Sequence, residues 1–263
     1  MTESIRVSLE RTGVARVTLA RPDKHNAFDA ELIEGLTAAM VRLDDDAAIS
    51  IVVLTAEGAS FSAGADLEWM RQSAGKDRAG NLADARALAE LMRTLNGLRK
   101  TTIALVQGAA YGGGVGLVAC CDIAIASDAA RFCLSEVKLG LIPAAISPYV
   151  IDAIGGRQAR RLFQTAEVLP AVEAARIGLV HEVVAAGRLE ARGEELLSLL
   201  RKAAPGARNE AKRLISKVED HPRGEALFAL TSEWIATVRG GQEAFEGMSA
   251  FLERRPASWC RED

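Results

Sequence analysis

Apolar positions in the first part of the chain alternate between two patterns. Short apolar runs of strand length occur at residues 5–10, 14–20, 50–55 and 102–107, the first two around a turn that suits a hairpin. Between such runs, apolar residues recur at the helical interval of three or four, as do Leu32, Leu36, Met40 and Leu43 after a potential capping residue, Asp29. Strands separated by helices predict an α/β fold.

Beyond Pro143 the helical interval dominates. We expect helices at residues 148–155, 157–165, 171–176, 189–202, 207–218, 224–239 and 242–254, with one strand-like run at 179–184. The sequence therefore predicts two parts: a core over residues 1–190 and a helical region over residues 191–263, which packs on the core or on a neighbouring subunit. Upstream, the polar stretch 71–80 is expected to form a mobile loop before a helix over residues 82–98.

Composition and charge exclude several classes of function. The chain has 263 residues and a formal net charge of −3, which argues against nucleic acid as a partner. No apolar run approaches the roughly 20 residues of a membrane span, and the first six residues lack the features of a signal peptide. We therefore expect a cytoplasmic protein. Its four cysteines and three histidines match no metal-ligand spacing, so no metal site is expected.

The segment from Gly108 to Pro143 contains the residues that most suggest a catalytic site. Three consecutive glycines begin an apolar helix at residues 112–114, and one carboxylate, Glu136, follows among apolar residues. A second loop of small residues, 62–66, also comes between a strand and a helix. If the two loops converge, two backbone N–H groups could donate to one carbonyl oxygen and form an oxyanion hole.

The glycines and the carboxylate also allow other interpretations. A P-loop is excluded because no lysine follows the glycines. The pattern Gly114-Val-Gly-Leu-Val-Ala119 matches a dinucleotide fingerprint, but six residues separate it from the preceding strand. Two plainer roles stay open: the glycines serve close packing, and Glu136 caps a helix.

Six ordered blocks of sequence include these loops, and together they resemble the crotonase (enoyl-CoA hydratase/isomerase) superfamily over nearly the whole chain. The blocks are Arg21-Pro-Asp-Lys-His-Asn-Ala-Phe28, Phe61-Ser-Ala-Gly-Ala-Asp66, Gly108-x-x-x-Gly-Gly-Gly114, Cys121-Asp122, Phe132-x-x-x-Glu136 with Gly140-x-x-Pro143, and Phe251-Leu-Glu-Arg-Arg255. The resemblance implies a spiral core of repeated ββα units with a C-terminal helical region, and a homotrimer or dimer of trimers. It also implies acyl-CoA thioester substrates and no metal or redox cofactor.

The resemblance also implies roles for single residues. The backbone N–H groups of Ala63 and Gly113 would form the oxyanion hole, and Glu136 would act as acid or base. Thioester α-protons are weakly acidic, so such catalysis needs enolate stabilisation and a positioned carboxyl group. The residues implied to line the path of CoA and its acyl group are Lys24, Ala27, Ala63, Gly64, Ala65, Asp66, Gly113 and Gly116.

The chain departs from the family pattern at Gly116. Family hydratases with two glutamates carry one of them at this position, so the usual pair is absent here. One carboxylate suffices for a 1,3-proton shift, which indicates an enoyl-CoA isomerase. The detailed sequence of the glycine segment and of the segment around Glu136 instead resembles a bacterial branch of methylglutaconyl-CoA or carboxygeranoyl-CoA hydratases. Under that interpretation, Gly116 leaves room for a branched acyl group.

We favour a hydratase over an isomerase because of this resemblance. A third class is a crotonase-like protein that binds acyl-CoA without turning it over. Such a protein could begin with the loss of one catalytic glutamate, as at Gly116. Activity of a Glu136→Gln variant on enoyl-CoA thioesters separates these classes.

Overall fold

The computed structural model describes residues 4–10 and 12–260. Residues 1–3, part of the stretch examined for a signal peptide, lie outside this description. The chain divides into two compact units, one formed by the residues up to 98 together with 102–193, and one by 99–101 together with 194–263. The first unit contains both β-sheets and the second is helical, so the predicted α/β class with a helical C-terminal region is confirmed.

The larger sheet forms the first layer of the first unit. It has six strands in the order β1-β2-β3-β5-β7-β10. The predicted hairpin is confirmed, because β1 and β2 pair antiparallel with Ile5 opposite Leu19. The pairs β2–β3, β5–β7 and β7–β10 are parallel. The strands are β1 (Ile5–Leu9), β2 (Val14–Leu19), β3 (Ile51–Ala56), β5 (Thr101–Val106), β7 (Ile123–Ser127) and β10 (Glu182–Val184).

A smaller sheet has four short strands in the order β4-β6-β8-β9. The first three are mutually parallel, and β9 closes one edge antiparallel to β8. Each parallel strand follows a strand of the larger sheet after a few residues, so β3–β4, β5–β6 and β7–β8 form three similar turns of the chain. The strands are β4 (Ser60–Ser62), β6 (Ala109–Tyr111), β8 (Arg131–Cys133) and β9 (Leu169–Pro170).

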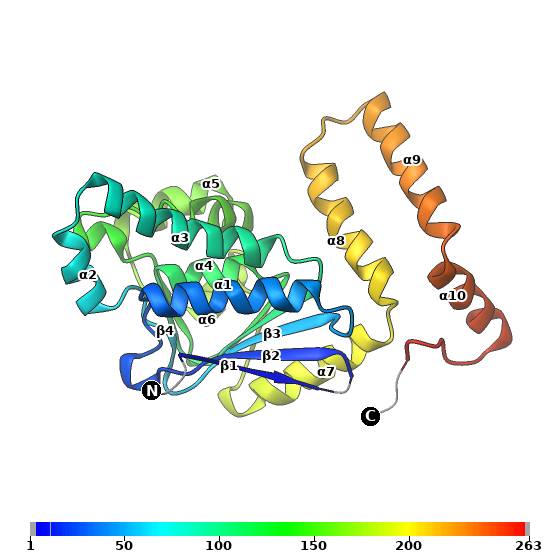
Figure 1. Ribbon diagram of the computed structural model, residues 1–263, viewed down its shortest axis with the longest axis horizontal. Coiled ribbons are helices and arrows are strands. Elements are labelled where there is room, and N and C mark those ends of the chain that lie inside the picture. Colours follow the sequence, from blue (N-terminus) through cyan, green and yellow to red (C-terminus); the bar gives the residue numbers. More distant parts are fainter. Residues whose placement is uncertain (1–3, 11, 261–263) are drawn as a thin grey trace. The chain divides into compact units, whose positions relative to one another are not determined.

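Helices cover the sheets of the first unit, and α1 packs alongside α3 (Figure 1). The Asp29 side chain accepts a hydrogen bond from the Leu32 N–H (2.9 Å), which confirms the predicted cap of α1. The long α5 breaks at Gly155, where φ is 74°, in agreement with two separately predicted helices. These helices are α1 (Ala30–Asp45), α2 (Leu67–Ala74), α3 (Arg78–Asn96), α4 (Gly113–Cys120), α5 (Ser147–Thr165) and α6 (Ala171–Arg176).

The prediction of a loop over residues 71–80 is wrong. Helix α2 extends into this stretch and α3 begins within it, because two aspartates supply caps. Asp66 accepts hydrogen bonds from two N–H groups of the first turn of α2, and Asp77 accepts one from the Gly80 N–H (2.8 Å). Capping of this kind stabilises short helices whose interior is polar.

The second unit consists of most of α7 (Leu189–Arg201) with α8 (Pro205–Glu219), α9 (Glu225–Arg239) and α10 (Gln242–Glu253). The Glu243 carboxylate of α10 accepts hydrogen bonds from the N–H groups of Gly206 and Ala207, both at 2.9 Å. This carboxylate therefore caps the N-terminus of α8, where negative charge is favourable. Across the described residues, no helix is both long and apolar enough to cross a membrane.

Candidate active site

The three parallel strands of the smaller sheet end at one place. After β4 comes the loop 63–66, after β6 come Gly112 and Gly113, and shortly after β8 comes Glu136. A Cβ atom on Gly64 would lie 3.2 Å from the Tyr111 carbonyl oxygen and 3.9 Å from the Gly112 Cα. The predicted convergence of the two glycine-containing loops is therefore confirmed. Carboxyl ends of parallel strands are the usual place for a ligand in α/β proteins.

Glycine is required at the closest point of this convergence. Gly64 and Gly112 have φ of 88° and 50°, a region that residues with a side chain rarely adopt. A Cβ on Gly112 would lie 3.2 Å from Glu136 Oε1 and 3.8 Å from the Gly64 Cα. Both loops and the carboxylate thus meet around Gly112.

The other glycines of the run serve close packing. A Cβ on Gly113 would lie 3.0 Å from the Phe28 ring, and one on Gly114 would lie 2.9 Å from the Ser62 carbonyl oxygen. The packing role left open for these glycines is therefore correct for Gly113 and Gly114. This packing role is compatible with a second role for the Gly113 N–H, because the close contact is at the position of a side chain and does not involve the N–H group.

Glu136 is the first residue of the short 3-10 helix η2 (Glu136–Leu139). Its Oε2 atom is buried and accepts no hydrogen bond from any described residue. Burial raises the pKa of this carboxyl group above its ordinary value, and a hydrogen bond from its own backbone N–H offsets this in part. A carboxyl group of raised pKa beside two loops of bare backbone suits proton transfer.

Ala63 is not free to form an oxyanion hole. Its N–H donates a hydrogen bond to the His25 carbonyl oxygen (2.9 Å), so the assignment implied by the resemblance is wrong for this residue. Two residues further on, the N–H of Ala65 has no acceptor among the described residues, and Ala65 is exposed. The peptide groups around it are held by Phe28, whose N–H donates to the Gly64 carbonyl (2.7 Å) and whose carbonyl accepts from Asp66 (2.8 Å).

The N–H of Gly113, like that of Ala65, has no acceptor among the described residues. Gly113 is the first residue of α4, where backbone N–H groups have no partner within the helix. The described residues supply no other acceptor for it. Ala65 and Gly113 therefore present two unpartnered donors from the two converging loops.

Asn26 holds the turn before α1 against the start of β4, the strand that leads into the first of these loops, a role that the sequence did not reveal. This fully buried side chain accepts a hydrogen bond from the Arg21 N–H (2.8 Å) and donates to the carbonyls of Glu57 (2.8 Å) and Ser60 (2.9 Å). His25 and Asn26 both adopt positive φ, at 50° and 53°. Asparagine tolerates this conformation, and its place in the polar stretch between a strand and a helix was the signal that could have indicated a pinned turn.

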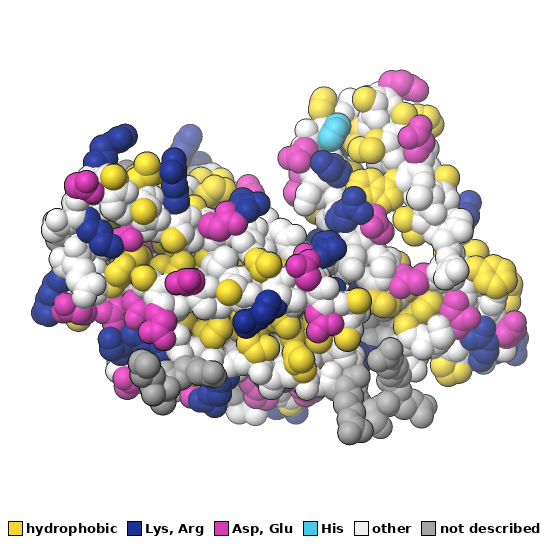
Figure 2. All heavy atoms as spheres, in the orientation of Figure 1, with side chains coloured by type: hydrophobic (Ala, Val, Ile, Leu, Met, Phe, Trp, Pro, Cys, Tyr) yellow, Lys and Arg dark blue, Asp and Glu magenta, His cyan; other side chains and the backbone are white. Residues whose placement is uncertain are grey.

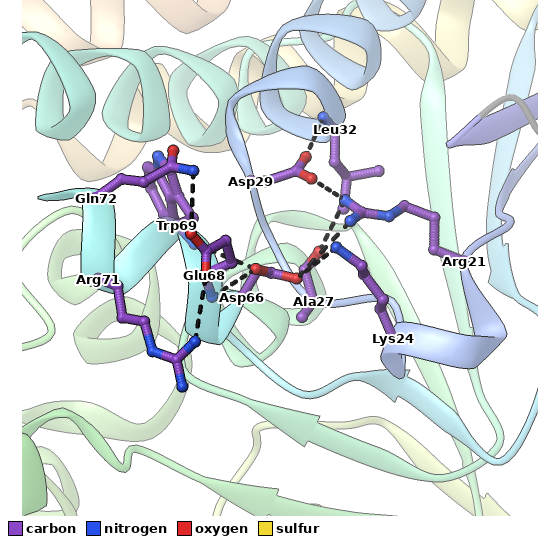
Figure 3. Close-up of polar contacts among 10 residues, drawn as sticks. All are labelled: Arg21, Lys24, Ala27, Asp29, Leu32, Asp66, Glu68, Trp69, Arg71 and Gln72. Atoms are coloured by element: carbon purple, nitrogen blue, oxygen red, sulfur yellow. Dashed lines mark hydrogen bonds and ion pairs between the residues drawn. The ribbon is translucent and has the colours of Figure 1, made fainter. Parts of the chain in front are cut away.

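A cluster of charges lies next to the same loop (Figure 3). Lys24 Nζ lies 3.3 Å from Asp66 Oδ2, and Arg21 forms an ion pair with Asp29. Burial alone would raise the pKa of Asp66, but hydrogen bonds from the Trp69 N–H, the Lys24 ammonium and the Glu68 N–H hold it below its ordinary value. Asp66 is therefore an ionised helix cap in the structure.

The remaining predicted binding residues differ in accessibility. The Lys24 side chain is 48% exposed, while Ala27 is almost fully buried. Ala63 is exposed and Gly64 is buried against the second loop. A contact of these residues with CoA stays a prediction.

Gly116 does not leave room for an acyl branch. A Cβ atom there would overlap Ile146 Cγ2, and would lie 2.9 Å from Ile146 Cβ and 3.1 Å from Met92 Cε. The expectation of free space at this position is therefore wrong, because two apolar side chains fill it. Sequence alone could not pair Gly116 with Ile146, since they are 30 residues apart, one within α4 and the other just before α5.

A metal ion needs several ligating side chains from the described residues to lie together. No three His, Cys, Asp or Glu side chains lie close enough together there for such a site. The expected independence from metal and cofactor stays a prediction.

Known proteins resemble the chain over nearly its full length. The family model described as "Enoyl-CoA hydratase/isomerase" matches residues 10–262. A short-chain-enoyl-CoA hydratase of Clostridium acetobutylicum is 33% identical over 256 residues, which cover 95% of each chain. The crystal structure of an enoyl-CoA hydratase from Shewanella pealeana is 44% identical, with a TM-score of 0.94 over 97% of this chain and 96% of that one. An enoyl-CoA hydratase/isomerase structure from Marinobacter aquaeolei is 32% identical, with a TM-score of 0.92 over 98% and 100%.

Proposed function

The chain belongs to the enoyl-CoA hydratase/isomerase family, and from this premise we propose that it adds water to the double bond of an enoyl-CoA thioester. The observation that carries the proposal is the meeting of Glu136 with two loops that each present one N–H group, of Ala65 and of Gly113, without an acceptor among the described residues. Relatives named enoyl-CoA hydratase support this direction of the chemistry.

The thioester carbonyl oxygen would accept hydrogen bonds from the N–H groups of Ala65 and Gly113. These donors stabilise the negative charge that develops on the oxygen as an enolate forms. The α4 helix begins at Gly113, and the partial positive charge of its N-terminus acts in the same sense. Both donors are backbone groups, so substrate binding needs no reorganisation of a side chain.

Glu136 would carry the proton in both halves of the reaction. Its ionised carboxylate takes a proton from water while the water oxygen bonds to the β-carbon and the electron pair of the double bond moves to the enolate. The carboxylic acid so formed then delivers that proton to the α-carbon, which regenerates the carboxylate. The net reaction is the addition of one water molecule. The raised pKa of Glu136 suits the second step, because it favours the protonated form that delivers the proton.

A second candidate function is isomerisation of a 3-enoyl-CoA to the 2-enoyl isomer. The observation that favours it is the filled position at Gly116, which leaves Glu136 without a second carboxylate from that residue. Glu136 would remove a proton from the α-carbon and return it to the γ-carbon through the same enolate. Binding of acyl-CoA without turnover is the third candidate. From the resemblance we retain 3-methylglutaconyl-CoA as the branched substrate to test. From the sequence features described above we retain the proposal of a cytoplasmic location.

The decisive experiment assays wild type and Glu136→Gln on 2-enoyl-, 3-enoyl- and 3-methylglutaconyl-CoA thioesters. Hydration and double-bond migration are followed separately. We expect hydration by the wild type and a loss of roughly 100-fold or more in the variant, the usual contribution of a general acid–base group. Glu34→Gln, at an exposed position of α1, is the matched control. Migration without hydration supports the isomerase, and equal activity of Glu136→Gln and wild type contradicts the assignment of Glu136.

A further inference from the structure

Among the glycines of α4, Gly116 is the one at which an added Cβ would come closest to another residue, Ile146. Ile146 is 2% exposed and precedes the first residue of α5. The atoms nearest to a Cβ on Gly116 are Cγ2 and Cβ of Ile146, which are close to the backbone and cannot swing away as the end of a long side chain can. Gly116 is itself inside a helix whose residues 114–118 are all buried. Neither partner can therefore retreat easily.

Position 116 also has a defined relation to Glu136. The Gly116 N–H donates to the Gly112 carbonyl (3.2 Å), so the two glycines are one helical turn apart on α4. Gly112 is the residue whose missing side chain makes room for Glu136 Oε1. A side chain at position 116 would thus emerge one turn beyond the contact with the carboxylate, at the start of the same helix.

We propose that Ile146 is a specificity-determining residue that keeps this site to a single carboxylate. Its side chain fills the space that an acidic side chain at position 116 would need, so the surroundings of that position are apolar. In the hydration proposed above, Glu136 must then both orient the water molecule and transfer its proton, a task that a second carboxylate at position 116 would share. This inference rests on the proposed function for its chemical consequence, but its packing consequence is independent of it.

A packing test separates Ile146 from the chemistry. Gly116→Ala is made in the wild type and in the Ile146→Ala background, and thermal unfolding is measured for the four proteins. We expect Gly116→Ala to lower the Tm of the wild type by about 3 to 10 °C, the cost of an overpacked core, and to leave the Tm of Ile146→Ala unchanged or raised. Gly35→Ala is the matched control, because it lies in α1 and its Cβ would meet only ordinary contacts at 3.8 Å. An equal loss in both backgrounds overturns the inference.

A chemical test compares Gly116→Glu/Ile146→Ala with Ile146→Ala. We expect the added glutamate to raise the rate of hydration by the order of 100-fold relative to Ile146→Ala, with little change in double-bond migration. A folded double variant that hydrates no faster than Ile146→Ala overturns the proposed control of specificity. If the wild type turns over no enoyl-CoA at all, the proposed function fails, whereas the packing test still decides whether Ile146 closes position 116.

Discussion

An oxygen of Glu136 lies 3.2 Å from the place that a Cβ atom on Gly112 would occupy. The carboxylate and the glycine backbone therefore share a space that exists because Gly112 has no side chain. Gly112 also has a φ of 50° and a ψ of −118°, a conformation suited to glycine. The position of the acid–base group and the start of α4 are linked at this point.

Replacement of Gly112 by alanine tests this link. We expect a loss of about 1 to 3 kcal/mol in stability from the strained backbone, together with lower activity because the new methyl group displaces Glu136. Thermal unfolding and kcat/KM are measured together. Gly156→Ala is the control, because the space around Gly156 is open and its φ is ordinary. Wild-type values of both quantities for Gly112→Ala would contradict the shared space.

The choice of Ala65 over Ala63 as the donor is tested by replacing a single backbone amide with an ester. Lactate in place of Ala65 removes an N–H that has no partner among the described residues, so we expect kcat to fall by about 100-fold with little effect on stability. Lactate in place of Ala63 is the matched control. It removes the hydrogen bond to His25 and is expected to cost about 1 kcal/mol of stability with a smaller effect on kcat. The reverse pattern would restore Ala63 as the donor.

The raised pKa of Glu136 predicts a pH-dependent cost in stability. Burial places this pKa above its ordinary value of 4.5, so the folded protein holds the proton more tightly than the unfolded chain. The favourable contribution is therefore fully present below about pH 4.5 and is lost as the pH rises through the raised pKa. At pH 8 we expect Glu136→Gln to melt at a higher temperature than the wild type, with the difference shrinking towards pH 4.5. Thermal melts across this range check it, with Glu34→Gln as the control; a constant difference would contradict it.

We propose that the chain assembles into a homotrimer or a dimer of trimers, and α10 offers the test. Four large apolar side chains on one side of this helix are exposed, Phe251 by 82% and Leu252 by 79%; the others are Phe245 and Met248. Hydrophobic side chains gather there on the surface (Figure 2). Patches of this kind mark interfaces. We expect Phe251→Glu/Leu252→Glu to lower the mass measured by light scattering, while Gln242→Glu on the same helix leaves it unchanged. A monomeric wild type would contradict the proposal.

Much of the fold and the identity of the site's loops follow from local sequence. Periodicity located the helices, and Asp29 was correctly identified as a cap, because both depend on residues only a few positions apart. The loop predicted over residues 71–80 failed for a related reason, since two caps outweighed its polar composition. The convergence of the two glycine loops was stated as a condition and needed the structure to confirm it.

The errors in the site come from contacts between distant residues. Ala63 and Ala65 are the same residue type in the same loop. They differ because only the Ala63 N–H donates a hydrogen bond to the His25 carbonyl, which the pinned turn around Asn26 places there. The space at Gly116 looked empty because a glycine indicates only that its own side chain is missing. Ile146, far along the chain, fills that space. Such pairings depend on tertiary packing, which spacing along a sequence does not record.

The three parallel strand ends of the smaller sheet divide the labour of the site by chemical type. The ends of β4 and β6 offer backbone, and the end of β8 offers a side chain. If the proposed function holds, substitutions after β8 can exchange the reacting group while the two backbone donors to the thioester oxygen are kept, because those donors have no side chain to mutate. The fold thus separates the side chain after β8, which a substitution can exchange for another chemical group, from the backbone after β4 and β6, which a substitution can only distort.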